Sequence, residues 1–173
     1  MHSEFEQEPP KARRRWRWLL EAALVAGVLF ALHSYQTRNV AGGTAPPFEA
    51  RLLDGTRVSL DDYRGRPMLL QFWATWCPVC RLEQGSIDAV ARDYPVLAVS
   101  LDEMNAADLQ AWMVGQGVSY PVAIDDSGEL ARLYGITGVP ASFVIDGNGE
   151  IRFTEVGYTS ETGLRLRLWW AGR

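Results

Sequence analysis

The segment FWATWCPVC at residues 72–80 contains the only two cysteines of the 173-residue chain, Cys77 and Cys80. A protein that places both thiols in one Cys-x-x-Cys step is not a disulfide scaffold, so the pair either exchanges disulfides or binds a soft metal ion. The apolar run MLLQFWA precedes the pair at residues 68–74, as a buried strand requires, and a helical pattern follows at 78–92. A thiol at a helix N-terminus lies near the positive end of the helix dipole, which lowers its pKa. This setting favours redox chemistry.

Two other uses of the cysteine pair stay open. A structural disulfide between them would close a loop of about four residues and would constrain the unfolded chain very little. As a metal site, two thiolates can hold Cu(I), whereas zinc normally takes four ligands. The two histidines, His2 and His33, both lie in the N-terminal part of the chain. We therefore predict no metal site and no organic cofactor, and keep a copper-binding or copper-protective thiol protein as the alternative.

The segments around the cysteines alternate between strand and helix patterns. Asp54-Gly55 between two apolar runs predicts a hairpin turn, and Gly147-Asn148-Gly149 predicts a second one. This alternation, followed by a hairpin and a last helix, indicates an α/β fold with a mixed central sheet and helices on both faces. We predict strands at 48–53, 56–60, 68–74, 95–101, 118–124, 142–146 and 150–156, and helices at 78–92, 105–117, 127–134 and 160–170.

The order of elements, with Cys-x-x-Cys opening a helix, resembles the thioredoxin fold. The stretch at 72–80 resembles the active site of thioredoxin-like proteins, and Gly138-Val139-Pro140 before a strand resembles their second landmark. The extra N-terminal hairpin resembles a membrane-tethered subgroup, which includes TlpA-like and cytochrome c maturation thioredoxins. That subgroup also includes the suppressor-of-copper-sensitivity D type of disulfide oxidoreductase, which the segments GYTS at 157–160 and LRLRLWW at 164–170 resemble most closely.

Three residues are the main catalytic candidates. Cys77, expected at an exposed helix N-terminus, is the predicted nucleophile, and the more buried Cys80 resolves the mixed disulfide. The resemblance implies that Pro140 is cis and faces the disulfide, where it keeps metal ions off the thiols. It also implies that the Val139 backbone pairs with an extended substrate. An ordinary turn proline before a strand is the alternative for Pro140.

The residues beside the cysteines are expected to contact substrate. Trp76 would lie at the surface next to Cys77 and offer an apolar docking spot for a partner peptide. Pro78 lacks an N–H and suits the first helical position. Pro78 and Val79 stand where ordinary thioredoxin has Gly-Pro, and the resemblance implies that these two residues influence the reduction potential.

A proton acceptor is the last expected part of the site. Glu83 follows Cys80 by one helical turn. A glutamate at this spacing lies near the thiols in cytochrome c maturation thioredoxins, although a solvated helix residue is an equal alternative. Gln71 stands where ordinary thioredoxin carries a buried aspartate, and glutamine cannot ionise. Asp102 and Glu103 are other candidate acids, for which we expect a surface loop.

The N-terminal segment carries a membrane signal. Residues 1–17 contain a basic cluster, and the apolar run at 18–35 is about 27 Å long as a helix, close to one hydrocarbon core. We predict an uncleaved transmembrane signal anchor at 18–35, a linker at 36–47 and a thioredoxin-like domain at 48–173. A cleaved signal peptide is the main alternative.

Charge and location limit the partners. The formal net charge of −4 argues against nucleic acid as a partner. The basic N-terminus should stay cytoplasmic, which makes the chain a single-pass protein of the bacterial inner membrane with a periplasmic domain. The expected partners are exported proteins with thiols or disulfides and a membrane redox partner. A monomer is compatible with one anchor and one active site.

Overall fold

The computed structural model describes residues 18–28, 31 and 40–173. The chain divides into two units, residues 1–38 and residues 39–173, and each is described by itself. Within the second unit, a six-stranded sheet has the order β1-β8-β7-β4-β5-β6. β4 pairs in parallel with β5 and antiparallel with β7, so the sheet is mixed as predicted. Its strands are β1 (Gly43–Thr44), β4 (Met68–Trp73), β5 (Val96–Ser100), β6 (Val122–Ile124), β7 (Ala141–Ile145) and β8 (Glu150–Val156).

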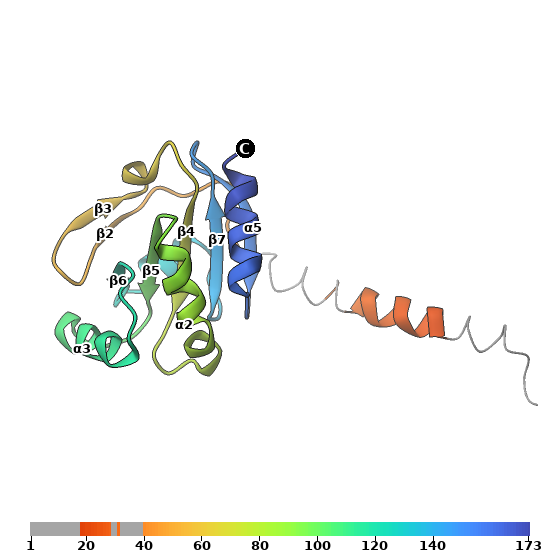
Figure 1. Cartoon of the computed structure of the whole chain (residues 1–173), viewed down its shortest axis with the longest axis horizontal. Coiled ribbons are helices and arrows are strands. Elements are labelled where there is room, and N and C mark those ends of the chain that lie inside the picture. Colours follow the sequence, from red (N-terminus) through yellow and green to blue (C-terminus); the bar gives the residue numbers. More distant parts are fainter. Residues whose placement is uncertain (1–17, 29–30, 32–39) are drawn as a thin grey trace, which may run out of the picture. The chain divides into compact units, whose positions relative to one another are not determined.

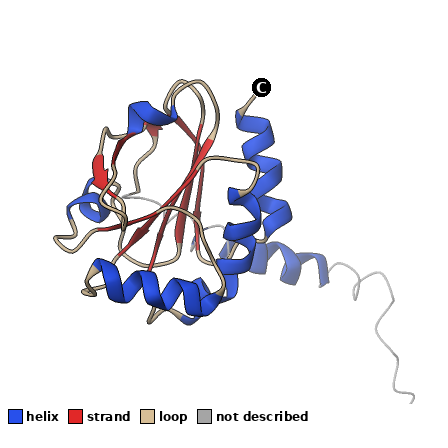
Figure 2. Ribbon diagram, turned by 60° about the vertical axis from the view of Figure 1, so that its left-hand side comes forward, coloured by secondary structure: helices blue, strands red, loops and turns tan. Residues whose placement is uncertain are grey.

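Helices cover both faces of this sheet (Figures 1 and 2). One core cluster joins the sheet to α2 (Pro78–Ala91), α3 (Ala106–Gln116) and α5 (Glu161–Ala171). A second cluster, on the other face, includes side chains of the 3-10 helix η1 (Leu60–Tyr63) and of α4 (Glu129–Leu133). The thioredoxin-like α/β architecture expected from the sequence is therefore confirmed.

The predicted N-terminal hairpin is present as a separate two-stranded sheet of β2 (Glu49–Arg51) and β3 (Arg57–Ser59). Asp54 Oδ1 accepts a hydrogen bond from the Thr56 amide at 2.8 Å, and Gly55 has a φ of 87°, which a residue without a Cβ adopts at no steric cost. Leu52 bridges to Ala123, so the hairpin lies against the β6 edge of the main sheet.

The expected linker at 36–47 is partly incorrect. Its residues 43–44 form β1, which pairs antiparallel with β8, and Ala45 is buried. The Ala45 amide donates to the Gly149 carbonyl at 2.8 Å. The folded unit therefore starts before Phe48, because the backbone of this polar segment completes the open edge of β8.

The predicted membrane segment at 18–35 falls in the first unit. Its residues 18–28 and 31 are helical, and the others lie outside the described residues. Within the described ranges, no helix is both long enough and apolar enough to cross a membrane. The transmembrane anchor at 18–35 and the basic segment at 1–17 stay predictions.

Candidate active site

The cysteine pair lies where β4 leads into α2. Cys77 is the N-cap residue of α2, and its Sγ accepts a hydrogen bond from the Cys80 amide at 3.1 Å. Pro78 occupies the first helical turn, where its missing N–H costs nothing. The free amides and the dipole of the helix N-terminus favour negative charge on this sulfur. Reduction of the pair would therefore release a thiol whose ionised form the helix stabilises.

Cys77 and Cys80 form a disulfide, with their Cα atoms 5.3 Å apart. Cys80 is the more buried of the two, as expected, but Cys77 is also covered, with only 4% of its surface exposed. The expected exposed position of Cys77 is thus incorrect for the oxidised protein. The reason is the segment before β7, which lies directly against the sulfur.

That segment is the Val139-Pro140 step, whose peptide bond is cis as the resemblance implied. The Val139 carbonyl oxygen lies 3.6 Å from Cys77 Sγ, and Pro140 is buried. The structure thus brings Val139 and Pro140 to the nucleophile from a segment about 60 residues further along the chain. Their roles in binding substrate stay predictions.

The predicted substrate-contacting residues surround the disulfide at the surface. Trp76 is 65% exposed, and Pro78 and Val79 are exposed beside it. Trp73, by contrast, is buried and stacks on Trp112, with ring centroids 5.6 Å apart. An exposed aromatic ring next to the sulfur pair gives a partner peptide an apolar contact within reach of Cys77.

Glu83 is fully buried, which excludes the alternative of a solvated helix residue. It lies one turn after Cys80 on the buried stripe of α2, a spacing that brings Cβ atoms to within about 5–6 Å. Gln71 donates to one carboxylate oxygen at 3.2 Å, and the Thr159 amide donates to the other. Burial raises the pKa of Glu83 to about 7, against the opposing effect of these two hydrogen bonds. Glu83 can therefore exchange protons near neutral pH.

The expected surface-loop position of Asp102 is also incorrect. It is buried, and its carboxylate accepts hydrogen bonds from the Thr75 amide at 2.9 Å, the Thr75 hydroxyl at 2.6 Å and the Ser100 hydroxyl at 2.6 Å. β4 and β5 run in parallel with Trp73 beside Ser100, so residues just beyond the two strand ends meet. Asp102 therefore fixes the loop that holds Trp76 and Cys77, and Glu103 is exposed as expected.

A metal site was the alternative use of the two thiols. Among the described residues, no group of three or more His, Cys, Asp or Glu side chains could hold a metal ion. Copper binding by the two thiolates alone stays the alternative stated above.

Comparisons with known proteins agree with this geometry. The AhpC/TSA family profile matches residues 41–154. The chain belongs to the AhpC/TSA family. Thiol-disulfide oxidoreductase ResA of Bacillus cereus is 30% identical over 150 residues, or 82% of this chain and 86% of the relative. This AhpC/TSA member is thus a thioredoxin-like thiol–disulfide oxidoreductase, as the sequence predicted.

Solved structures of thioredoxin proteins extend the comparison to the fold. A thiol:disulfide interchange protein of the thioredoxin family from Chlorobium tepidum has a TM-score of 0.66 at 30% identity, covering 76% of this chain and 97% of its own. The exposed lipoprotein thioredoxin Etrx1 from Streptococcus pneumoniae has a TM-score of 0.63 at 30% identity, covering 72% and 99%. The similarity covers 72% to 76% of this chain.

Proposed function

We propose that this oxidoreductase is tethered to the bacterial inner membrane and exchanges disulfides with exported proteins through Cys77 and Cys80. The observation that carries the chemistry is the disulfide at the N-terminus of α2, with the Val139 carbonyl beside Cys77 Sγ. The proposed location rests on the basic residues before the apolar run at 18–35, which favour a cytoplasmic N-terminus. Substrate disulfides persist in the exported compartment, where the domain would act.

In the reducing direction, the Cys77 thiolate attacks one sulfur of a substrate disulfide. The other substrate sulfur leaves as a thiolate and takes up a proton. The Cys80 thiolate then attacks Cys77 Sγ, which breaks the mixed disulfide, releases the second substrate thiolate and restores the Cys77–Cys80 bond. Two electrons pass to the substrate, so a membrane partner carrying a dithiol must reduce the pair again. The same steps run backwards when the protein acts as an oxidant.

Glu83 is the proton acceptor for Cys80 in this scheme. The resolving thiol must lose its proton before it attacks, and it is buried away from solvent. A carboxyl group with a pKa of about 7 is partly ionised at neutral pH, so it can both accept and return a proton. Gln71, which donates to Glu83, cannot take this role because an amide does not ionise.

A dedicated reductant of cytochrome c maturation is the second candidate. The buried Glu83 favours it, because the resemblance to cytochrome c maturation thioredoxins includes a glutamate at this spacing. The reduction potential of the Cys77–Cys80 pair distinguishes the candidates, measured by tryptophan fluorescence in dithiothreitol or glutathione buffers. A value near or below about −250 mV supports a reductant. A value of about −180 to −120 mV belongs to oxidants and isomerases and contradicts the cytochrome role.

Trapping tests the exchange activity directly. In Cys80→Ser the nucleophile remains but the resolving thiol is absent, so mixed disulfides with client proteins should accumulate. Cys77→Ser is the matched control and should trap nothing. If Cys80→Ser also traps nothing and the unaltered protein holds Cu(I), a copper-binding function replaces the proposal.

A further inference from the structure

Helix α5 presents apolar side chains on two different faces. Leu164 and Leu168 are fully buried and belong to the core cluster that includes α2. A second set, Leu166, Trp169 and Trp170, is exposed by 46% to 62%. Its spacing i, i+3, i+4 places the three side chains on one stripe of the helix. We name these three residues the outer stripe of α5, and Arg173 follows just beyond the last helical residue, Ala171.

Several arginines lie along α5 and at its end, although the whole chain is acidic. Two of them are paired, Arg165 with Asp93 and Glu161, and Arg167 with Glu155. After Glu161 the helix has no acidic residue. The Arg173 guanidinium lies 3.9 Å above the ring of Trp169. Arg66 is exposed, and the next residue, Pro67, packs beside Gly172 at the end of the helix. Neither Arg66 nor Arg173 has an acidic side-chain partner in the described part of the chain, so the surface is apolar with free cations at its margin.

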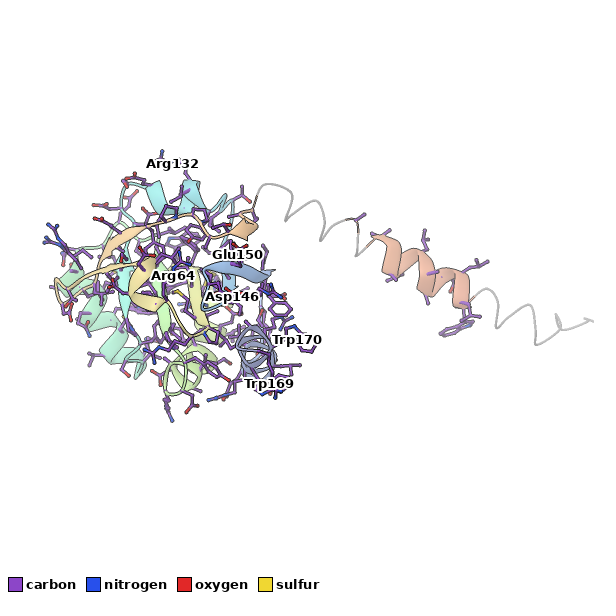
Figure 3. The ribbon with its side chains drawn as sticks, turned by 90° about the horizontal axis from the view of Figure 1, so that it is seen from above. Arg64, Arg132, Asp146, Glu150, Trp169 and Trp170 are labelled. Atoms are coloured by element: carbon purple, nitrogen blue, oxygen red, sulfur yellow. A yellow bond between two sulfur atoms is a disulfide. The ribbon has the colours of Figure 1, made fainter. Side chains whose placement is uncertain are left out.

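The chain is short between the apolar segment at 18–35 and Val40, the first described residue of the folded unit. Five residue steps separate Tyr35 from Val40, a span that cannot exceed about 18 Å in any conformation. Thr44 pairs with Glu150 in β8, and Figure 3 shows Trp169 and Trp170 on the same side of the folded unit as Glu150. The outer stripe and β1 thus lie toward the same edge of the sheet, although Val40 and Ala41 pack on the face opposite α5.

We propose that the outer stripe of α5 lies on the anionic surface of the lipid bilayer. This inference rests on the membrane anchor of the proposed function. Tryptophan rings are favoured at the membrane–water interface, and arginine at the margin of the stripe attracts anionic headgroups. A second copy of the chain or a protein partner would also cover the apolar rings. The short tether favours the bilayer, because it keeps the folded unit near the membrane that holds the proposed anchor.

The position of α5 gives this contact a functional consequence. The last turn of the helix lies beside Pro67, just before β4 begins, whereas Cys77 follows the other end of β4. The start of the helix lies near Thr159, whose amide binds Glu83 of the active site. A bilayer under the outer stripe therefore leaves the disulfide at the far end of the sheet, directed toward exported substrates.

Photocrosslinking of the full chain tests the contact. Trp170→p-benzoylphenylalanine is reconstituted into phosphatidylethanolamine–phosphatidylglycerol vesicles, with Leu166→p-benzoylphenylalanine as a second probe on the same stripe. The matched control is Val114→p-benzoylphenylalanine, since Val114 is 68% exposed on α3. None of these residues belongs to the proposed active site, so insulin-reduction activity in the same vesicles reports that each variant is folded.

We expect at least about tenfold more lipid adduct at positions 166 and 170 than at position 114. Equal adducts at all three positions, no lipid adduct at any, or an adduct with twice the mass of the chain would overturn the proposal. Release of the protein by alkaline carbonate would overturn it together with the anchor. Retained activity without lipid adducts contradicts only the contact, whereas lost activity in the unaltered chain contradicts the proposed function.

Discussion

The two faces of the central sheet share the same three middle strands but differ in the side chains that these strands contribute. Toward α2, each of β4, β5 and β7 carries one buried polar residue: Gln71, Ser100 and Ser142. Gln71 and Ser142 are direct neighbours across β4 and β7. Toward α4, the strands contribute only apolar residues, namely Met68, Leu70, Phe72, Leu97, Val99, Ala141, Phe143 and Ile145.

This difference follows from the alternation of side chains along a strand. Buried polar groups cost free energy unless they are paired, so a face with several of them is a poor source of stability. The opposite face is filled with aromatic rings, with Tyr134 in contact with Phe72 and Phe143. We infer that the α4 face supplies packing energy and that the α2 face uses part of it to hold Glu83 and Gln71 next to the cysteines.

The largest expected effect is the loss of disulfide exchange without any change in the packing on the two faces of the sheet. Cys77→Ser should reduce insulin-disulfide reduction to the rate without enzyme, because no other described residue offers a thiolate at the helix N-terminus. Its urea denaturation midpoint should stay close to that of the reduced wild type. Measurable turnover by this variant would show that Cys80 alone can act as the nucleophile.

Phe143→Ala should weaken the packing on the α4 face of the sheet without altering disulfide exchange. Phe143 is fully buried, and its ring centroid lies 5.1 Å from that of Tyr134, so the truncation should cost about 3–5 kcal/mol of unfolding free energy. Urea denaturation measures this cost. The reduction potential of the folded variant should stay unchanged, and a shifted potential would mean that the two faces are coupled.

Glu83→Gln should have a moderate effect that depends on pH. Removal of the proton acceptor should slow disulfide exchange by about 100-fold at pH 7 and abolish the inflection expected for the wild type near this pH. Glu103→Gln, an exposed carboxyl near the same edge, is the matched control and should behave like the wild type. A retained inflection in Glu83→Gln would assign the proton transfer to another group.

The same variant should change how stability depends on pH. The folded pKa of about 7 lies above the unfolded value of about 4.3, so the folded state binds more protons between these values. Wild-type stability should therefore fall as pH rises through this window, by about 4 kcal/mol in total, and Glu83→Gln should lack this slope. Parallel curves for the two proteins from pH 5 to pH 8 would contradict the raised pKa.

The smallest effect concerns the loop before the cysteines. Asp102→Asn loses a charged acceptor for the Thr75 amide, which should cost about 1.5 kcal/mol of stability. The shift of Trp76 fluorescence on reduction should also become smaller, because the loop is less firmly held. If the variant is less stable but its Trp76 fluorescence shifts on reduction as much as in the wild type, Asp102 has only a structural role.

Local signals explain what the sequence could predict. The hairpin at Asp54-Gly55 and the N-cap position of Cys77 depend on neighbouring residues only, so their patterns are visible in one stretch of chain. Burial of Glu83 depends on Thr159, which lies 76 residues further on and returns through the β8–α5 connection. No local pattern contains that contact, which is why the solvated alternative stayed open.

The two misplaced segments have a similar cause. Asp102 looks like an acidic loop residue in sequence. Its carboxylate is nevertheless buried, because it accepts the hydrogen bond of the Thr75 amide at the end of the neighbouring strand. Residues 43–44 form a strand of two residues without apolar side chains, and they are extended only because they pair with the free edge of β8. In both cases a backbone group distant in sequence determines where the residue lies. The pattern of apolar side chains along the sequence does not reveal such a contact.

The attachment of the first residues of the folded unit also has a mechanical meaning. A pulling force applied at Val40 would be borne by the bond from the Ala41 amide to the Tyr134 carbonyl, the β1–β8 pairing and the bond from the Ala45 amide to the Gly149 carbonyl. None of these bonds involves α2, the loop after β4 or the Val139-Pro140 step. Tension along the chain would therefore peel the sheet edge before it disturbed the disulfide, and the redox centre would keep its geometry under load.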